Sequence, residues 1–308
     1  MMRGGRMEFN EFSQKLKDLV KSRNTDAEVR VSKVVKINGV EKTALTILPA
    51  GAEYAPNIYL ERVYGLYQSM QLSIDQAAEY VMHLHRNYLK QMEAGCLLKD
   101  EIRDFEKIRN RLTLRMVNRE KNRKMLEEVV SIPCLDLEGV FYVAEDLNKM
   151  DVIMRVTREL MKSCGVERED LEKTAMENLK TKAAFQVKDI CEVICSCGFG
   201  QLPAADRGEP YLYVLTDISM RNGPAALLVP EILRKVSEEL ESDLLLLPSS
   251  VNELIVLRDR KTEFWRSEYQ ELKKVVKDIN QTIVDPEEIL GDSIYKFSRI
   301  QSELSVAV

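Results

Sequence analysis

Residues 244–257 read LLLLPSSVNELIVL, two apolar runs separated by a short polar segment. The first run ends at Pro248, and the second resumes at Leu254. Apolar runs joined by about five residues that include Pro and Ser are typical of a β-hairpin, because Ser and Asn side chains satisfy backbone polar groups in turns. The pattern predicts two buried strands and a connecting turn, and it leaves open whether the turn also carries chemistry.

The segments on either side of this stretch predict further strands and helices. Residues 211–217 (YLYVLTD) predict an apolar strand, and residues 223–241 predict a helix that begins after an Asn-Gly pair. Pro230 is expected to kink this helix or to restart it. Residues 263–280 alternate apolar and charged positions with helical spacing and predict a long amphipathic helix.

The N-terminal third of the chain has its own pattern. Residues 8–23 have the spacing of an amphipathic helix, and residues 27–51 alternate around an Asn-Gly pair at 38–39, which predicts a β-hairpin. Two helices are expected to follow, the second capped by Ser73 or Asp75. These elements predict a small unit that contains helices and a β-hairpin.

The middle of the chain alternates predicted strands and helices. The expected strands are residues 111–118, 137–146 and 152–157, and the expected helices are residues 98–109, 119–130 and 163–180. Together with the C-terminal pattern, they predict the α+β class, with a mixed sheet core and flanking helices. We expect two domains, a smaller one at residues 7–95 and a larger α/β unit at residues 96–308.

Composition excludes several classes of protein. The chain has 308 residues, 45% of them apolar and 31% charged, which is typical of a globular protein. Its net charge of -5 provides no overall attraction to nucleic acid or to an anionic membrane. No apolar run approaches the ~20 residues that span a bilayer. Because the sequence shows no secretory signal, we expect a cytoplasmic protein. Residues 3–6 resemble a translated ribosome-binding site, which predicts that translation starts at Met7 in a bacterium.

The polar turn could form an enzyme site, of a hydrolase or a transferase, together with the loop at residues 217–223. The candidate ligand residues in these two segments are Asp217, Asn222, Gly223, Ser249, Ser250, Asn252 and Glu253. A nucleophilic serine needs a base within hydrogen-bond reach. The chain's only histidines, His83 and His85, are far from the turn in sequence, and no Gly-x-Ser-x-Gly motif is present. Catalysis by a Ser-Lys pair remains an alternative. The residues favour a structural turn.

Neither a metal nor a cofactor is expected. Cys191, Cys195 and Cys197 have the spacing C-x3-C-x-C, without the second Cys pair that is usual in a zinc site. His83 and His85 are two positions apart and therefore point to different faces of a helix. No glycine-rich nucleotide-binding motif is present. Six unevenly spaced cysteines do not indicate a disulfide framework.

A basic run, RNRLTLRMVNREKNRK at residues 109–124, suggests contact with an anion. Arg111, Thr113 and Arg115 should share the outward face of a strand. Four cations should then occupy the first turns of the next helix, where the helix dipole disfavours them: Arg119, Lys121, Arg123 and Lys124. A phosphate backbone would stabilise such a cluster. The alternative is a solvated face balanced by the acidic residues at 100–106, and the absence of aromatic residues weakens the nucleic-acid interpretation.

Several segments in a fixed order resemble the bacterial family designated domain of unknown function 5688, which is common in Firmicutes of the gut. They are APNIYLERVYGLYQ, LTLRMVNREKNRKMLEEVVSIPCLDLEGVFYV, VEREDLEKTAMENL, YVLTDISMRNGPAALLVPEILRKVSEEL, LLLLPSSVNELIVL and VVKDINQTIVDPEEILGDSIYKF. The resemblance extends over nearly the whole chain from Met7. It implies a cytoplasmic protein, often encoded in mobile regions of genomes. The family has His where this chain has Asn252, and Asn where it has Asp217, which favours a structural role for the turn.

These observations predict a non-enzymatic binding or accessory protein, with a mobile element as its candidate origin and another protein as its partner. Nucleic acid is a weaker candidate partner, and no membrane is expected. Two alternatives remain. One is the hydrolase or transferase with its site at the 249–253 turn and the 217–223 loop. The other is a homo-oligomeric structural protein, which should expose an apolar face on the last helix around Trp265.

Overall fold

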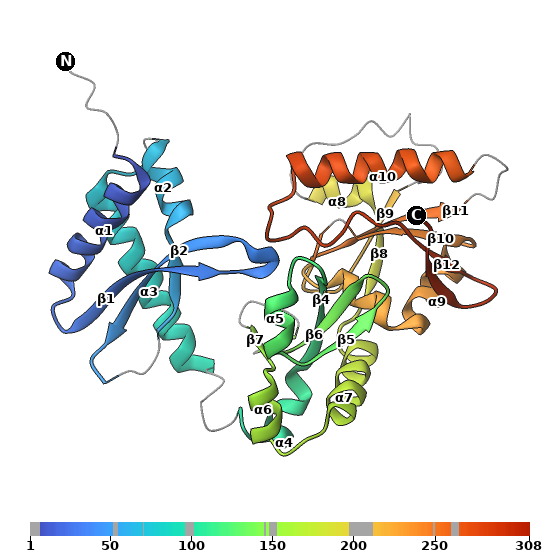
Figure 1. Ribbon diagram of the computed structural model, residues 1–308, viewed down its shortest axis with the longest axis horizontal. Helices are drawn as coiled ribbons and strands as arrows, with labels where there is room; N and C mark the ends of the chain where they lie inside the picture. The colour runs from blue at the N-terminus through green and yellow to red at the C-terminus, as the bar shows by residue number, and fades with distance from the viewer. Residues whose placement is uncertain are drawn as a thin grey trace. The chain divides into compact units, whose positions relative to one another are not determined.

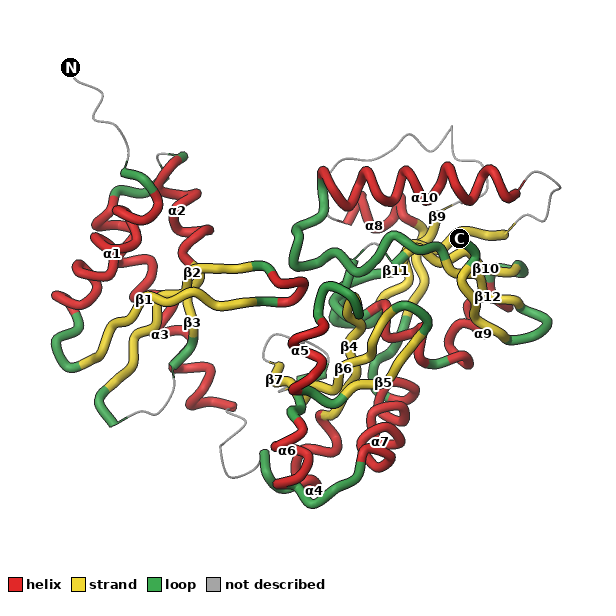
Figure 2. Tube along the Cα trace, viewed as in Figure 1, coloured by secondary structure: helices red, strands yellow, loops and turns green. Residues whose placement is uncertain are grey.

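The computed structural model describes residues 7–51, 55–69, 71–95, 102–144, 146–147, 153–196, 212–248, 250–259 and 265–308. The chain divides into two compact units, residues 1–97 and 98–308 (Figures 1 and 2). Among the described helices, none is long and apolar enough to cross a membrane. The expected start at Met7 concerns residues 1–6, which lie outside the described ranges.

The first unit packs three helices with a three-stranded antiparallel sheet of order β1-β2-β3. Its elements are α1 (Phe9–Arg23), β1 (Ala27–Val35), the 3-10 turn η1 (Ile37–Gly39), β2 (Glu41–Pro49), β3 (Asn57–Tyr59), α2 (Leu60–Gln68) and α3 (Ile74–Gly95). The predicted hairpin is confirmed, with Asn38 and Gly39 both in the left-handed region that such a turn requires. Ser73 caps α3: its Oγ accepts from the Gln76 backbone N–H, while the Gln76 side chain accepts from the Ser73 N–H.

The second unit begins with a four-stranded antiparallel sheet in which β6 pairs with β4, β5 and β7. The elements of this part are α4 (Phe105–Ile108), η2 (Arg109–Arg111), β4 (Leu112–Asn118), α5 (Arg123–Glu128), β5 (Ser131–Cys134), β6 (Leu137–Ala144), β7 (Ile153–Arg155), α6 (Arg158–Ser163) and α7 (Arg168–Thr181). Of the predicted helix at 98–109, residues 98–101 lie outside the described ranges, and the described part forms the single turn α4, which begins after an Asp104 cap.

A six-stranded antiparallel sheet of order β13-β12-β10-β11-β9-β8 completes the second unit. Its strands and helices are β8 (Gln186–Asp189), α8 (Ile190–Ser196), β9 (Leu212–Thr216), the 3-10 helix η4 (Gly223–Leu228), α9 (Pro230–Glu239), β10 (Asp243–Leu247), β11 (Leu254–Asp259), α10 (Trp265–Thr282), β12 (Tyr295–Ser298) and β13 (Glu303–Val306). Pro230 restarts the helix, because η4 ends before it and α9 begins at it.

The four leucines at 244–247 are all buried because β10 is covered on both faces. Leu244 and Leu246 face a core that includes Met116 of β4, so this core joins the two sheets. Leu245 and Leu247 face the opposite side, where Val276 of α10 packs on them. Figure 1 shows α10 lying across this face. The stretch that predicted the hairpin is thus the centre of the larger unit.

The α+β class with sheets and flanking helices is confirmed. Every strand pair between described residues is antiparallel, which refines the expected mixed sheet. The short strands β3, β5, β8, β12 and β13 were not predicted, since three or four residues are too few for a periodic pattern.

Candidate functional site

The 217–223 loop and the turn after β10 lie against each other. The backbone N–H of Gly223 donates to the Asn252 carbonyl oxygen at 2.8 Å, and the Thr216 hydroxyl donates to the same oxygen at 3.2 Å. A Cβ atom on Gly223 would lie 2.3 Å from the Leu215 carbonyl oxygen and 2.9 Å from the Cα of Glu253. Only glycine therefore allows the two segments to approach this closely.

Asp217 organises the loop. Its buried carboxylate accepts hydrogen bonds from the Ser219 hydroxyl at 2.7 and 2.8 Å, and from the backbone N–H groups of Arg221 at 3.1 Å and Asn222 at 3.2 Å. The loop places Met220 in the left-handed backbone region. The carboxylate is satisfied by its own loop, so Asp217 positions the segment instead of presenting a free charge.

Ser250 is engaged in the turn. Only 4% of it is exposed, and its Oγ accepts from the Asn252 backbone N–H at 3.0 Å. Burial raises the pKa of Glu253 above its usual value. A hydrogen bond from Ser250 opposes this shift, and the charge of Glu288 adds to it. Ser249 lies outside the described residues. This arrangement is that of a hydrogen-bonded turn around a half-buried carboxylate.

Arg115 belongs to the same cluster. This corrects the expectation that the side chains of Arg111, Thr113 and Arg115 share the outward face of a strand. Thr113 is buried, and the Arg115 Nη2 donates to the Asn252 Oδ1 at 3.0 Å. Burial lowers the pKa of Arg115. Sequence reasoning placed Arg115 and Asn252 in two separate candidate sites, because 137 positions separate them along the chain. The structure brings Arg115, the loop and the turn into one site, here called the Arg115 site.

The remaining basic residues do not form the predicted helix start. The helix α5 begins only at Arg123, so Arg119 and Lys121 lie in the preceding turn. Arg119 donates to Glu138 at 2.9 Å and to the Leu137 carbonyl oxygen at 2.8 Å, while Arg123 pairs with Glu120. The expectation that four cations occupy the first turns of this helix is therefore wrong for Arg119 and Lys121, whereas Arg123 and Lys124 are the first two residues of α5. Arg111 is half-buried, and Lys121 and Lys124 are exposed.

The other chemistry-bearing residues are dispersed. His83 is exposed, whereas His85 is buried, and burial lowers its pKa. Cys191 and Cys195 are half-buried, and Cys197 is outside the described part of the chain. The portion that the structure describes contains no group of three or more His, Cys, Asp or Glu residues able to hold a metal ion.

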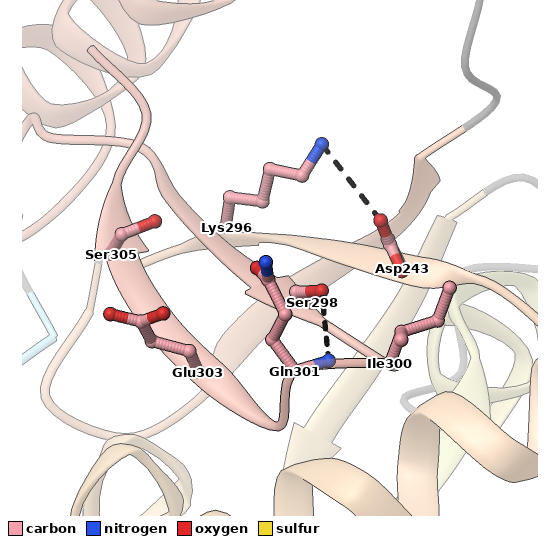
Figure 3. A pocket seen from close by; sticks show the side chains of 7 residues that line it. All are labelled: Asp243, Lys296, Ser298, Ile300, Gln301, Glu303 and Ser305. Atoms are coloured by element: carbon pink, nitrogen blue, oxygen red, sulfur yellow. Dashed lines mark hydrogen bonds and ion pairs between the residues drawn. The ribbon is translucent and has the colours of Figure 1, made fainter.

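Two pockets occur at other places among the described residues. The larger, of about 330 Å³, lies on β12 and β13 (Figure 3). Its Lys296 ammonium group is 2.5 Å from an Asp259 oxygen and 3.9 Å from an Asp243 oxygen, so this cation is already paired. The smaller, of about 240 Å³, lies between α1 and the β1–β2 hairpin. Neither includes a residue of the Arg115 site.

Cys134 should be chemically inert in the folded protein. Burial, followed by the charge of Asp136, raises the pKa of its thiol to about 11 from a usual value of 9.0. Two pKa units lower the thiolate fraction near neutral pH about hundredfold. We expect iodoacetamide at about pH 8 to alkylate Cys134 at least a hundredfold more slowly in the native protein than in urea, as measured by peptide mass spectrometry. Equal rates in the two states would contradict this assignment.

The helix α10 exposes a row of aliphatic side chains. Val275, Ile279 and Ile283 are 52%, 40% and 77% exposed, and they follow one another at intervals of four residues. Ile283 continues the last turn, because its backbone N–H donates to the Ile279 carbonyl oxygen at 2.8 Å. Val276, on a different face of the helix, is buried against β10 and β11. We call these three residues the α10 row. The side chain of Trp265 is not among those described.

The fold and these sites define a two-unit α+β protein that has a charged cluster between its two larger sheets and an apolar row on its last long helix. The chain belongs to the family of unknown function DUF5688, whose model matches residues 9–299. This confirms the family resemblance found from the sequence motifs.

Two further comparisons add little to the family assignment. A stretch of 52 residues is 38% identical to a glucose-1-phosphate adenylyltransferase from Teredinibacter turnerae, and it covers 17% of this chain and 12% of that protein. The chain therefore matches only a small part of that enzyme's length. No solved structure matches the chain significantly.

Proposed function

We propose that this protein is a non-enzymatic accessory protein of the bacterial cytoplasm that binds another protein through the α10 row. The exposure of Val275, Ile279 and Ile283 on one side of a single helix carries this proposal. Single apolar residues on a surface are ordinary, whereas a contiguous row marks a contact surface. Residues four apart form a ridge that packs into the groove of another helix.

The size of the α10 row favours a short segment of a partner over a second copy of the chain. Three aliphatic side chains at these exposures present roughly 300 Å² of apolar surface, against the ~800 Å² per partner of a standard stable interface. A stable dimer would need more than this row. An amphipathic helix of a partner protein can dock its own aliphatic ridge on the row, and this contact needs no larger apolar surface than the row provides.

The hydrogen bonds of the Arg115 site support a binding role over the hydrolase or transferase alternative. The Ser250 hydroxyl is buried in its turn, and Asp217 is satisfied within its loop. The pairing of Arg119 with Glu138 and of Arg123 with Glu120 likewise favours a protein partner over nucleic acid. The short match to a nucleotidyl-transferring enzyme covers too little of that protein to transfer its activity.

Replacing Ile279 with glutamate tests the proposal. The variant should keep its fold, because an exposed substitution changes stability by about 0.5 kcal/mol or less, but it should bind the partner at least about tenfold more weakly. The partner would be captured with tagged protein from nuclease-treated lysate of the source organism, and its affinity would then be titrated. Gln281→Glu is the matched control, because it adds the same charge at another exposed position of α10.

The outcomes separate the alternatives. A partner that the wild-type protein and the Gln281→Glu variant retain, and that Ile279→Glu loses, supports the proposal. If every captured protein binds Ile279→Glu as well as the wild type, the α10 row is not the binding surface. Self-association that Ile279→Glu abolishes, measured by light scattering, would indicate the homo-oligomer instead. A ligand that nuclease removes would indicate nucleic acid.

A further inference from the structure

The cavity of about 240 Å³ between α1 and the β1–β2 hairpin is built within the first unit. It is lined by Asn10, Ser13 and Gln14 of α1, by residues 31–33 of β1 and by Thr43 of β2. All of these residues except Val31 carry a polar side chain, and none of them carries a carboxylate. The composition of the lining therefore favours a polar ligand and disfavours a cation.

Thr43 provides an unused hydrogen-bonding group in this lining. Only 5% of the residue is exposed, and its Oγ1 is buried without a hydrogen-bond partner. Its backbone N–H donates to the Oε1 of Glu61 at 2.6 Å, which fixes the position of the residue. A buried hydroxyl without a partner is unfavourable, because the hydrogen bonds that it made to water in the unfolded chain are not replaced. A ligand in the cavity that accepts a hydrogen bond from Thr43 would remove this cost.

Lys33 places a positive charge beside Thr43. The two residues lie directly opposite each other in the β1–β2 pairing. Because the Thr43 N–H is bonded to Glu61 and not to β1, they form a non-hydrogen-bonded pair, the kind in which opposite side chains lie closest. Lys33 is exposed and forms no ion pair with any residue that the structure describes. An uncompensated cation and a buried donor are thus neighbours on one face of the sheet.

The other polar groups of the lining are neutral. The Ser13 hydroxyl donates to a backbone carbonyl of its own helix at 2.7 Å, so its Oγ can only accept from a ligand. The amide NH2 of Gln14 is engaged within α1 at 3.3 Å, which leaves its Oε1 as an acceptor. Asn10 and Ser32 make no hydrogen bond through their side chains in the described part of the chain, and both can donate. The cavity therefore offers donors to a negative group and acceptors to hydroxyl or amide groups.

The position of the cavity beside the start of α1 also favours a negative ligand. Asn10 lies in the first turn of this 15-residue helix, and no side chain caps its N-terminus. The partial positive charge at a helix N-terminus stabilises anions nearby. Glu8 and Glu11, the carboxylates at this end of α1, do not line the cavity. The helix end and Lys33 therefore act in the same direction.

We propose that this cavity binds a small organic carboxylate, whose carboxyl group contacts Lys33 and Thr43. A carboxylate carries one negative charge, which a single cation and a helix end can balance, whereas a phosphate monoester carries about 1.5 to 2. The rest of the molecule would occupy the space beside Val31, and hydroxyl or amide groups on it would donate to Ser13 and Gln14. This site lies in the first unit and is independent of the α10 row.

Calorimetry of the full-length protein at constant ionic strength tests this proposal. The probes are acetate, lactate, glycerate and N-acetylglycine, each compared with its neutral primary amide, and inorganic phosphate. At least one of the acids should raise the Tm by at least about 5 °C at about one hundred times its Kd. Its amide, which lacks the charge, should bind at least about tenfold more weakly.

Thr43→Val is the decisive variant, because it removes only the hydroxyl group. The Tm of the ligand-free protein should stay the same or rise, since that hydroxyl has no partner to lose. Binding of the active carboxylate should weaken roughly tenfold. Thr43→Ser, which keeps the hydroxyl, should bind within about threefold of the wild type.

Lys33→Gln tests the charge. It should weaken binding by roughly fivefold, because Lys33 is exposed and its charge is screened by solvent. Lys90→Gln, which removes an exposed cation on α3 outside the lining, should leave binding unchanged. The proposal is overturned if no carboxylate shifts the Tm, if the amides bind as well as the acids, or if phosphate binds and the carboxylates do not. It is also overturned if Thr43→Val and Lys33→Gln both bind as the wild type does, or if Lys90→Gln weakens binding as much as Lys33→Gln.

Discussion

Replacing Gly223 with alanine is expected to destabilise the second unit by about 3–5 kcal/mol. The added Cβ would meet backbone atoms only, at 2.3 Å from the Leu215 carbonyl oxygen, 2.9 Å from the Glu253 Cα and 3.0 Å from the Thr216 Cα. No side chain can rotate to make room. The 217–223 loop would have to separate from the turn, and the hydrogen bond from Gly223 to Asn252 would be lost.

Urea unfolding followed by circular dichroism measures this loss. Gly65→Ala on α2 is the control, because a Cβ at Gly65 meets nothing within 4 Å. In a helix this replacement should stabilise the protein by about 0.5–1 kcal/mol, since alanine loses less backbone entropy than glycine on folding. If Gly223→Ala unfolded at the same urea concentration as the wild type, the close approach of loop and turn would be wrong.

Replacing Phe12 with alanine is expected to destabilise the first unit by about 3–5 kcal/mol and to leave the second unit unchanged. Phe12 is fully buried, and its ring lies 5.2 Å from that of Tyr64 and 4.9 Å from that of Tyr67. These residues belong to a core that contains no residue of the second unit. We propose that the two units are domains that unfold separately, each held by its own core.

Calorimetry of the full chain should therefore show two transitions, of which Phe12→Ala lowers only one. Phe297→Ala is the reciprocal test, because Phe297 is buried in the core of the second unit. If Phe12→Ala abolishes the first transition altogether, Phe12→Leu provides a milder variant whose Tm can be measured. A single transition that both variants lower equally would show that the units unfold together.

Much of the fold could be predicted from local patterns. Helical spacing of Phe12, Leu16 and Val20, the Asn38-Gly39 turn, and the two apolar runs around Pro248 each specify an element within a few residues. Short strands such as β12 and β13 could not be predicted, because four residues carry no period. The strand β12 forms by pairing with β10, where Tyr295 lies opposite Leu246, and β13 then pairs with β12.

The candidate site was half predictable. Asp217, Asn222, Gly223 and Asn252 could be proposed together, because two turns at the same end of neighbouring strands come close. Arg115 could not be added to them. Its alternation with Leu114 and Met116 predicted a solvated side chain, since a strand pattern cannot show that Asn252, 137 positions further along the chain, accepts a hydrogen bond from it.

By itself the sequence determined the longer elements, the Asn38-Gly39 turn and the family, because capping, periodicity and backbone conformation depend on residues close together in the chain. Only the tertiary structure decided which charges are compensated. It pairs Arg119 with Glu138, leaves Arg115 without a carboxylate, and exposes the α10 row. Electrostatic energies and burial depend on distances through space, and residues 137 positions apart can be neighbours without any local sign of it.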